Sequence, residues 1–524
     1  MTLLSAVTAV EETPVDRFLA EQADLTAVER FAQRHHAARE PAQARYYRDL
    51  VPLTAPGPGQ QYGFEVDLDA CTGCKACVVA CHSLNGLDDG ESWRSVTTVT
   101  GTVAGGPFQQ TVTSACHHCV DPACMNGCPV DAYEKDPATG IVVHLDDQCI
   151  GCSYCTLTCP YEVPVLNHAR GIVRKCDMCR GRLAEGEAPA CVQACPNQAI
   201  AVRVVDTSVL VAASAAAPIA GMPPATITIP STVYRTDSGR VSAMAPAAPG
   251  GMAAAAPARP RPAQAHPPLA AMLVLTQLSV GAFVVDLAMR SHGSLHAAVA
   301  LGAGVLALAA STLHLGRPLY AYRAVIGLRH SWLSREVVAF GAFTGLAFLH
   351  AVGVLRTVVG WSAAGVGLFG VACSVLIYTS THRAAWRPSV VTAKFAATTV
   401  ILGGTAAAWA SAVSGAATPS WLVGLVAGLT AAKLAAESTG ARALHSDLRR
   451  RAAARFACGA GALALVPAAM TVPLLWTVVL GGLLAGEYLE RWLFFTTASP
   501  PSTTFGSSGP VSGPDDPKVG GESR

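Results

Sequence analysis

Charged and aromatic side chains are both scarce in this sequence. Asp, Glu, Lys and Arg make up 14% of its 524 residues, aromatic residues make up 6%, and the formal net charge is only +2. A protein without a basic surplus lacks the electrostatic footprint of nucleic-acid binding, so we expect no nucleic-acid partner. Hydrophobic residues make up 51% of the sequence, an average that hides two unlike halves.

The N-terminus also lacks the pattern of an export signal. Residues 1–10 are largely apolar, but Glu11, Glu12 and Asp16 follow at once, and neither a basic segment nor a pair of arginines precedes them. We therefore expect that the protein has no export signal of its own. Export together with a partner that carries a signal is the alternative.

The sequence divides into a cysteine-rich part and an apolar part. Sixteen of its 18 cysteines lie between Cys71 and Cys195, whereas most long apolar runs follow Leu269. Residues 253–268, rich in Ala and Pro, have the composition of a disordered linker. The expected segments are an N-terminal helical extension (1–61, with a helix near 15–39), a cysteine-rich domain (62–205), an extension and linker (206–268), a membrane anchor (269–497) and a disordered tail (498–524).

Eight apolar runs are each close to the roughly 20 residues that a helix needs to cross a bilayer. The last two run together across Thr471-Val472-Pro473, so seven spans is the main alternative to eight. The predicted spans lie near residues 269–289, 295–315, 337–355, 361–380, 395–413, 420–437, 453–470 and 474–495.

The loops between these runs differ strongly in charge. Those after the second, fourth and sixth runs carry twelve Lys or Arg residues, whereas the opposite loops carry only Arg290 and Arg356. Because basic loops stay in the cytoplasm, we expect a multi-pass inner-membrane protein whose cysteine-rich part faces the cytoplasm. Basic loops can also serve to bind a domain docked on the same face, which is the alternative reason for their position.

The clustered cysteines form four groups of four. Each group contains the C-x-x-C spacing, and in three groups the last cysteine precedes a proline. The groups are Cys71, Cys74, Cys77 and Cys81; Cys116, Cys119, Cys124 and Cys128; Cys149, Cys152, Cys155 and Cys159; and Cys176, Cys179, Cys191 and Cys195. Closely spaced thiolates wrap three corners of a cubane cluster, and the fourth cysteine ligates the neighbouring cluster.

Zinc and disulfides are the alternative uses of so many cysteines. Tetrahedral zinc takes four ligands in two pairs, and it does not call for a third cysteine at C-x-x-C spacing followed by Cys-Pro. The fourfold repetition of the pattern therefore favours iron–sulfur clusters over both zinc and disulfides.

On these motifs, residues 62–205 resemble the four-cluster electron-transfer subunits of molybdopterin oxidoreductases, such as dimethyl sulfoxide, polysulfide and nitrate reductases. The resemblance implies an α+β, two-fold ferredoxin-like domain with four [4Fe–4S] clusters and a separate molybdopterin-containing catalytic subunit as partner. It also implies that motif one shares ligands with motif four, and motif two with motif three. The implied sets are Cys71, Cys74, Cys77 with Cys195; Cys176, Cys179, Cys191 with Cys81; Cys116, Cys119, Cys124 with Cys159; and Cys149, Cys152, Cys155 with Cys128.

Two lysines stand next to these cysteines in the sequence. Lys75 and Lys175 each adjoin a ligand, so either can raise the potential of a cluster. The alternative is that each is an ordinary surface lysine.

The apolar part resembles the anchor subunit of dimethyl sulfoxide reductases. The matching positions are Leu313-His314-Leu315-Gly316-Arg317-Pro318-Leu319, Ser331-Trp332-Leu333-Ser334-Arg335-Glu336, Gln277, and Gly486-Glu487 with Arg491. This resemblance implies an all-α bundle without haem, embedded in the bilayer, that oxidises menaquinol close to the cluster domain. It places His314 at the quinol site.

Quinol oxidation releases two protons with two electrons, so its site needs proton-accepting groups near a cluster. We predict His314, Glu336 and Arg335 as the quinol-oxidising residues, and Gln277 with His314 as quinone-binding residues. Haem b is the alternative cofactor, and it would need His314 and His350 to face each other. The remaining ionisable groups in or near the apolar runs, which form either structural ion pairs or a proton path, are Asp286, Lys433, Glu437 and Glu487.

The sequence thus predicts an electron conduit between the quinone pool and a catalytic partner. Electrons pass from menaquinol through four clusters to the molybdopterin subunit, where terminal reduction takes place. The reverse flow, from a dehydrogenase to quinone, uses the same parts and stays open. A sensory or structural role is less favoured, because a sensor does not need four clusters tied to a membrane bundle. The sequence leaves the terminal substrate open.

Overall fold

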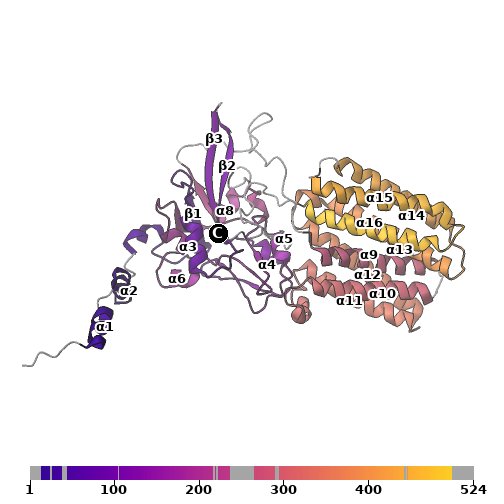
Figure 1. Ribbon diagram of the computed structural model, residues 1–524, viewed down its shortest axis with the longest axis horizontal. Helices are drawn as coiled ribbons and strands as arrows, with labels where there is room; N and C mark the ends of the chain where they lie inside the picture. Colours follow the sequence, from indigo (N-terminus) through magenta and orange to yellow (C-terminus); the bar gives the residue numbers. More distant parts are fainter. Residues whose placement is uncertain are drawn as a thin grey trace, which may run out of the picture.

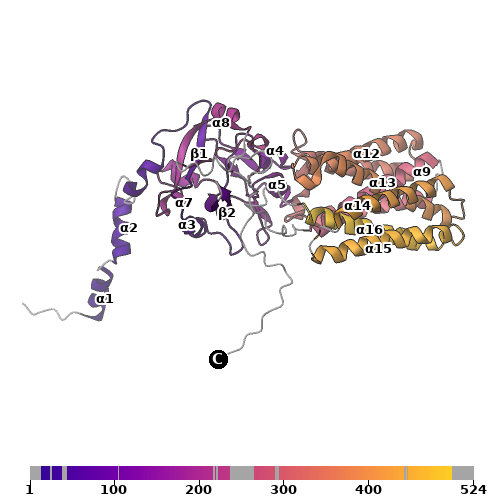
Figure 2. The ribbon, with the colours of Figure 1, turned by 90° about the horizontal axis from the view of Figure 1, so that it is seen from above.

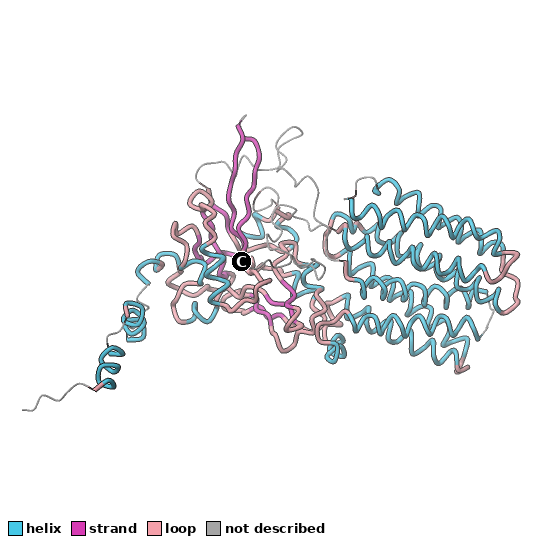
Figure 3. The backbone as a smooth tube through the Cα atoms, viewed as in Figure 1, coloured by secondary structure: helices cyan, strands magenta, loops and turns pink. Residues whose placement is uncertain are grey.

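The computed structural model describes residues 13–23, 26–37, 44–103, 106–215, 219, 222–236, 265–289, 294–441, 444 and 446–498. The protein forms a cysteine-rich part of short strands, short helices and loops, which abuts one end of a bundle of long helices (Figure 1). Figure 3 shows the contrast between the two, because nearly all strands lie in the first part. Most of the predicted linker, the predicted tail after residue 498, Arg290 and Arg442 lie outside the described residues.

Two helices precede the cysteine-rich part and extend away from it (Figures 1 and 2). They are α1 (Pro14–Ala23) and α2 (Ala27–Ala37), where the sequence predicts one helix near 15–39. Each begins with a capping box, in which a threonine and an acidic residue three positions later bond each other's backbone N–H. The second box starts a new helix at Thr26, which explains the division. Two short 3₁₀ turns follow, η1 (Ala44–Tyr46) and η2 (Arg48–Leu50).

A three-stranded sheet of order β8-β1-β9 organises the cysteine-rich part. Strand β1 (Gln60–Asp67) pairs antiparallel with β8 (Ile200–Asp206), with Phe64 opposite Val202. Strand β9 (Val233–Arg235) pairs parallel to β1 on the other side. The predicted boundary at residue 205 therefore falls inside the folded unit, because β9 comes from the following segment and completes the sheet.

Three β-hairpins and several short helices carry the cysteine loops. The hairpins are β2 (Ser95–Val103) with β3 (Gly106–Ser114), β4 (Tyr133–Lys135) with β5 (Val142–His144), and β6 (Val165–Asn167) with β7 (Ile172–Arg174). The helices are α3 (Ala76–Leu84), α4 (Ala123–Gly127), α5 (Tyr154–Thr158), α6 (Arg180–Ala184), α7 (Ala190–Gln193), α8 (Thr207–Ala213) and the 3₁₀ turn η3 (Ala225–Ile227). The β2–β3 hairpin projects from the body, whereas α4 and α5 face the bundle (Figures 1 and 2).

The prediction of an all-α membrane part is confirmed, because the described residues after 266 form a bundle of long helices. Its long helices are α9 (Pro267–Met289), α10 (Ser294–Leu313), α11 (Trp332–Ala351), α12 (Arg356–Thr379), α13 (Pro388–Val413), α14 (Ser420–Ala441), α15 (Ser446–Ala469) and α16 (Leu475–Thr496), with the 3₁₀ turns η5 (Pro318–Val325) and η6 (Ala384–Trp386) between them. Among the described residues, seven helices are long and apolar enough to cross a membrane. The eighth, α16, has the length, but it contains Glu487, Glu490 and Arg491.

Helix α9 lies at the centre of the bundle and packs against α10, α12, α13 and α16. It approaches α13 very closely where Gly281 faces Gly403, because a side chain at either position would overlap the backbone of the other helix. Buried aromatic residues belong to the same hydrophobic core, among them Phe283, Phe343 and Phe395. Small residues thus allow backbone contact at the centre, as is typical of membrane helices.

Candidate iron–sulfur centres and their contact with the membrane bundle

The same backbone turn recurs in all four cysteine motifs. In each motif, the residue immediately before the second cysteine has a left-handed conformation: Gly73 (φ 76°), His118 (φ 40°), Gly151 (φ 69°) and Met178 (φ 60°). The turn aims the backbone N–H of this residue at the first thiol, as in Gly151 N to Cys149 Sγ (3.4 Å) and Met178 N to Cys176 Sγ (3.3 Å). N–H donors of this kind favour the thiolate form that a metal cluster requires.

A second turn recurs after each Cys-Pro pair. The third residue after the cysteine is left-handed in Asp131, Glu162 and Gln198. The next residue donates its N–H to the cysteine sulfur in two of the three motifs, from Ala132 to Cys128 (3.3 Å) and from Ala199 to Cys195 (3.2 Å). The fourth cysteine of these motifs is therefore also held by a backbone donor.

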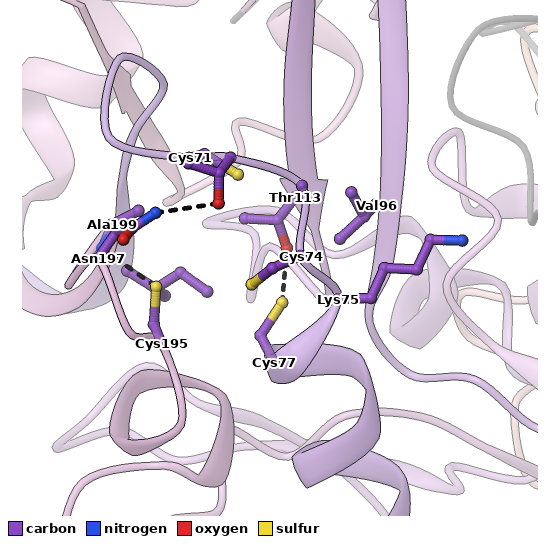
Figure 4. A pocket seen from close by; sticks show the side chains of 12 residues that line it. Cys71, Cys74, Lys75, Cys77, Val96, Thr113, Cys195, Asn197 and Ala199 are labelled. Atoms are coloured by element: carbon purple, nitrogen blue, oxygen red, sulfur yellow. Dashed lines mark hydrogen bonds between the residues drawn. The ribbon is translucent and has the colours of Figure 1, made fainter.

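Three thiols of motif one meet the last cysteine of motif four. Figure 4 shows Cys71, Cys74, Cys77 and Cys195 around a cavity. Thr113 on β3 lies beside it, with Oγ1 3.6 Å from Cys77 Sγ. Cys74 is exposed, so this cavity lies at the surface. These four cysteines are called the distal group below.

A second cavity lies elsewhere in the cysteine-rich part. Its lining includes Cys116, Cys119, Cys124 and Cys159, which are called the third group. Pro160 and Tyr161 also line this cavity. Both cavities contain the combination of cysteines that the resemblance implies, three from one motif and the last from another.

The other eight cysteines lie close together in two further sets. Burial, and then the charge of Cys191, raise the pKa of Cys81 to about 12. Burial, and then the charge of Cys128, raise the pKa of Cys152. Electrostatic effects of this kind on the thiol pKa values show which cysteines are neighbours. One set, called the second group, consists of Cys81, Cys176, Cys179 and Cys191. The other, called the membrane-proximal group, consists of Cys128, Cys149, Cys152 and Cys155.

Shared neighbours place the four groups in a row. Arg94 lies within electrostatic range of the distal and second groups, and Tyr133 within range of the third and membrane-proximal groups. Lys175 joins the second group to the third, because its Nζ donates to Cys116 Sγ (3.7 Å) and to the carbonyl oxygen of Cys176 (2.8 Å). The order is therefore distal, second, third and membrane-proximal.

The chemistry of these thiols fits a [4Fe–4S] cluster. Burial raises the pKa of Cys128 and of Cys159 to about 11, so without a positive core these thiols would stay protonated at neutral pH. The iron of a cubane supplies that positive charge. Within the described residues, no group of three or more His, Cys, Asp and Glu side chains is arranged to hold a single metal ion. In each of the two cavities, four cysteines line an open space rather than converging on a single point.

The two lysines singled out in the sequence differ sharply in position. Lys75 is exposed, and its side chain points away from the four thiols of the distal group (Figure 4). Lys175 is 4% exposed and hydrogen-bonded to a cysteine sulfur. Lys175 therefore contacts a cysteine sulfur directly, whereas Lys75 lines the distal cavity with its side chain directed away from the thiols.

The loop between α10 and α11 lies against the membrane-proximal group. His314 Nε2 is 3.1 Å from the carbonyl oxygen of Cys152, and His330 Nε2 is 3.0 Å from that of Cys128. Gly316 and Arg317 donate their N–H groups to the carbonyl oxygens of Gly151 and Ile150. The bundle thus contacts the backbone of two cysteines in one group.

Three glycines allow this close approach. A Cβ on Gly316 would overlap the carbonyl oxygen of Gly171, and a Cβ on Gly151 would lie 2.9 Å from the backbone of Gly316. Gly151 and Gly171 both have positive φ, 69° and 66°, a conformation that glycine adopts without strain. The two parts therefore meet backbone to backbone.

Tyr154 reaches from the membrane-proximal group into the bundle. It lies between Cys152 and Cys155 in the sequence, and its hydroxyl donates to the carbonyl oxygen of Ile377 (2.9 Å) and lies 3.1 Å from Ser380 Oγ. Burial raises the pKa of Tyr154, as does the nearby Glu336 carboxylate. The side chain is 4% exposed and packs within the hydrophobic core of the bundle.

Arginines of the basic loops also hold the two parts together. Arg317 and Arg323 donate to the carbonyl oxygens of Asp146 and Asp147, and Arg383 donates to that of Thr156. Some of the predicted positive-inside signal therefore has a second cause, namely docking of the cysteine-rich part.

The four predicted quinol-site residues are not joined by contacts with one another in the described structure. Glu336 is buried between α11 and α12, where Ser374 donates to its carboxylate. Gln277 accepts from Arg491 (2.9 Å) at the centre of the bundle. Arg335 donates to the carbonyl oxygens of Leu328 and Arg329 in its own loop. Only His314 contacts a cysteine loop directly.

The ionisable groups of the apolar runs form one buried network between α13, α14, α15 and α16. Glu487 binds Lys433 and Arg455, and Glu490 binds Lys394 and Arg491. Glu437 belongs to the same network through its ion pair with Arg455, in which Oε2 lies 3.3 Å from Nε. Asp286 lies apart, 3.9 Å from His296. Because each charge faces an opposite one, α16 tolerates three charged residues inside the bundle.

Sequence reasoning missed three residues near the cysteine loops. Tyr154 stands inside a C-x-x-C segment, and an aromatic residue at that place was a usable signal. Arg94 gives no local signal, since it stands in a polar stretch before β2. His266 lies at the end of the predicted linker, yet its ring is 5.5 Å from that of His314. Burial lowers the pKa of His266 to about 4.

Comparison with protein families gives two matches. A model of the 4Fe-4S dicluster domain matches residues 108–205, and a model of the DMSO reductase anchor subunit (DmsC) matches residues 264–438. The two matches lie in the cysteine-rich part and in the bundle, respectively. The protein is thus a fusion of an iron–sulfur unit that binds [4Fe–4S] clusters with a dimethyl sulfoxide reductase-type anchor.

Several individual iron–sulfur and B subunits are similar to about a third of this sequence. The B subunit of the anaerobic dimethyl sulfoxide reductase of Haemophilus influenzae is 37% identical over 185 residues, which are 34% of this sequence and 89% of that protein. The B subunit of the Escherichia coli K12 enzyme is 40% identical over 152 residues, 27% of this sequence and 72% of that protein. The iron–sulfur subunit of the nitrate-inducible formate dehydrogenase of E. coli is 35% identical over 169 residues, 28% of this sequence and 57% of that protein.

Proposed function

Because this protein belongs to the family of iron–sulfur subunits that includes the B subunits of anaerobic dimethyl sulfoxide reductases, we propose that it conducts electrons between membrane quinone and a molybdopterin-containing catalytic subunit. The observation that carries the proposal is the contact between the α10–α11 loop and the backbone of Cys152 and Cys128. It brings a hydrogen-bonding side chain of the membrane part directly onto one group of cysteines.

The four cysteine groups are the proposed ligand sets of four [4Fe–4S] clusters. Each set takes three thiolates from one motif and the fourth from another, in agreement with the two cavities. The row from the distal to the membrane-proximal group then forms a continuous path for electrons. When bound, the clusters supply one-electron redox chemistry. The protein holds their thiolates with backbone N–H donors and excludes water from the inner groups.

The row has two different ends, which suit two different partners. The membrane-proximal group lies against the bundle, where quinone is available. The distal group lies at the surface and contains the exposed Cys74, so a catalytic subunit docked there would meet a cluster edge. The fusion of both parts in one polypeptide fixes the first of these contacts.

The proposed quinol site is centred on His314. Quinol oxidation requires acceptors for two protons, and His314 is a suitable acceptor because its Nε2 is engaged with Cys152 while the second ring nitrogen can face a quinol hydroxyl. Glu336 is the second proposed acceptor, since it lies near Tyr154 of the same cysteine loop. Arg335 and Gln277 are engaged elsewhere, so we assign them no direct role.

Haem is not needed in this proposal. His314 directly follows α10 at the cysteine-rich part, whereas His350 lies at the far end of α11 and contacts Phe283. By helical rise, α11 spans about 30 Å between its ends. The two histidines that could have held haem b therefore do not face each other.

The protein is an integral membrane protein, and we propose the bacterial inner membrane with the iron–sulfur part in the cytoplasm. The basic residues in the loops after the second, fourth and sixth apolar runs support this side. They do so even when the docking residues Arg317, Arg323 and Arg383 are left out. Fusion of an alkaline phosphatase reporter to the α9–α10 loop tests it. Activity of that fusion, but not of one in the α10–α11 loop, is expected.

Direction of flow is proposed as quinol to catalytic subunit, following the dimethyl sulfoxide reductase relatives. The similarity to a formate dehydrogenase subunit supports the reverse flow as the second candidate. Stopped-flow mixing of oxidised membranes with a menaquinol analogue tests the main proposal. Rapid bleaching of the cluster absorbance that a quinol-site inhibitor prevents is expected. Bleaching only by a catalytic-side donor, followed by quinone reduction, would support the reverse flow.

A further inference from the structure

A buried arginine stands between the distal and second groups. Arg94 is 2% exposed, and the charges of Cys77 in the distal group and of Cys81, Cys176 and Cys191 in the second group all act on it. Its Nη1 donates to Thr113 Oγ1 (3.1 Å), which in turn lies 3.6 Å from Cys77 Sγ. The guanidinium is thus linked through one hydroxyl to a proposed ligand.

The other two nitrogens of the Arg94 guanidinium have neither a hydrogen-bond acceptor nor a carboxylate beside them in the described structure. Nε and Nη2 of Arg94 are buried without a hydrogen-bond partner, and no carboxylate pairs with Arg94 within the described ranges. One face of the group stacks on Phe64, 4.8 Å from the ring centre. Leaving N–H groups of a charged side chain unpaired in the interior is costly, so a negative group should face them.

A cubane held by four thiolates is such a group. It carries net negative charge, which increases when the cluster accepts an electron. Arginine keeps its proton in proteins, so its positive charge is permanent. In a buried site this charge is weakly screened and acts on both neighbouring clusters.

We propose that Arg94 sets the potentials of the clusters in the distal and second groups, by favouring their reduced forms and offsetting the repulsion between the two when both are reduced. The same arrangement recurs one step further along the row, where buried Lys175 stands between the second and third groups. This inference rests on the proposed ligand sets, but neither on quinone nor on the direction of flow.

The test is redox-titrated electron paramagnetic resonance of the full-length protein in membranes, with iron analysis of the same samples. In R94Q, the oxidised-to-reduced ratio of the distal and second clusters at a fixed potential should rise at least tenfold, which is about 59 mV for a one-electron couple. The membrane-proximal cluster should not change and serves as the internal control. R94K keeps the charge and should shift both clusters by less.

Each outcome decides a separate claim. Full iron content in R94Q with unchanged potentials would overturn the role of Arg94. If R94Q loses iron, R94K decides: retained clusters with near-native potentials support the role of the charge, whereas loss of iron in R94K as well would show that Arg94 only fills space. Absence of four cluster signals in the unmodified protein would instead contradict the proposed ligand sets.

Discussion

His314 of the membrane bundle and Cys152 of the cysteine-rich part are joined by a hydrogen bond of 3.1 Å between Nε2 and the backbone carbonyl oxygen. The residue that the anchor resemblance marks in the sequence therefore touches the backbone of a proposed cluster ligand. In the proposed function, electrons and protons of quinol separate at this contact. Cys128, Cys149, Cys152 and Cys155 would hold the cluster that supplies one-electron chemistry there, and His314 and Glu336 would accept the two protons.

Removal of one thiol from the membrane-proximal group should reduce the iron content. Cys155→Ala is expected to lose between one iron and a whole cluster, up to about a quarter of the total, because a cubane needs all its ligands. Iron analysis of purified protein measures the loss. Cys373→Ala, which removes a buried thiol of α12, is the matched control. Equal iron contents in the two variants would contradict the proposed ligand set.

Gly316→Ala should loosen the junction between the two parts. The added methyl group would overlap the backbone of Gly171, and relief of such overlap typically costs about 1–3 kcal/mol. Hydrogen exchange of residues 150–152 and 314–317 should therefore be faster than in the unmodified protein. Gly302→Ala, on an open face of α10, should leave exchange unchanged. Unchanged exchange in the Gly316 variant would show that the junction adapts to a side chain there.

Tyr154→Phe should weaken the same junction through the loss of its hydroxyl. This change removes the contacts with Ile377 and Ser380, worth about 0.5–1.5 kcal/mol for a typical hydrogen bond. Tyr154→Ala also removes the ring and should cost about 3–5 kcal/mol. Thermal unfolding in detergent, followed by loss of cluster absorbance, measures both. If the phenylalanine variant were as unstable as the alanine variant, the hydroxyl rather than the ring would be the main anchor.

Glu487→Gln should destabilise the bundle strongly. It leaves Lys433 and Arg455 without their shared carboxylate in a fully buried position, and breaking a buried ion pair in this way costs about 3–5 kcal/mol. Helix unfolding measured by circular dichroism should begin at lower temperature. Glu134→Gln, at an exposed position of β4, is the control. The double variant with Lys433→Met should recover part of the loss, and failure to do so would assign the effect to packing.

The sequence allows the membrane helices and the cysteine groups to be predicted, because both signals are local. Apolar runs locate each of α9 to α16, although the predicted starts of α13 and α15 lie seven residues too late, and C-x-x-C spacing identifies the cluster loops. The partition of Cys81 and Cys195 between clusters comes only from the family resemblance, since their partners are far away in the sequence.

Features that depend on tertiary contacts cannot be predicted in this way. Arg94 is an ordinary arginine in the sequence. It lies between two cysteine groups only because motifs one and four come together in the folded protein. Glu336 and Gln277 lie in matching motifs, but a motif does not specify which neighbouring helix a side chain faces. The basic loops indicate topology or docking, and only the contacts show that Arg317 and Arg383 bind the cysteine-rich part.

The proposed quinol site makes the most direct prediction for His314. In redox-titrated electron paramagnetic resonance of membranes, a quinol-site inhibitor should alter the signal of one cluster in the unmodified protein. His314→Ala should abolish that response and slow quinol-driven cluster reduction at least tenfold, a change of about 1.4 kcal/mol in activation free energy. His330→Ala also removes an imidazole contact with a cysteine carbonyl, but at a half-exposed position, and should keep both. An inhibitor response and reduction rate that survive in His314→Ala would contradict the coupling of quinone to the clusters at this residue.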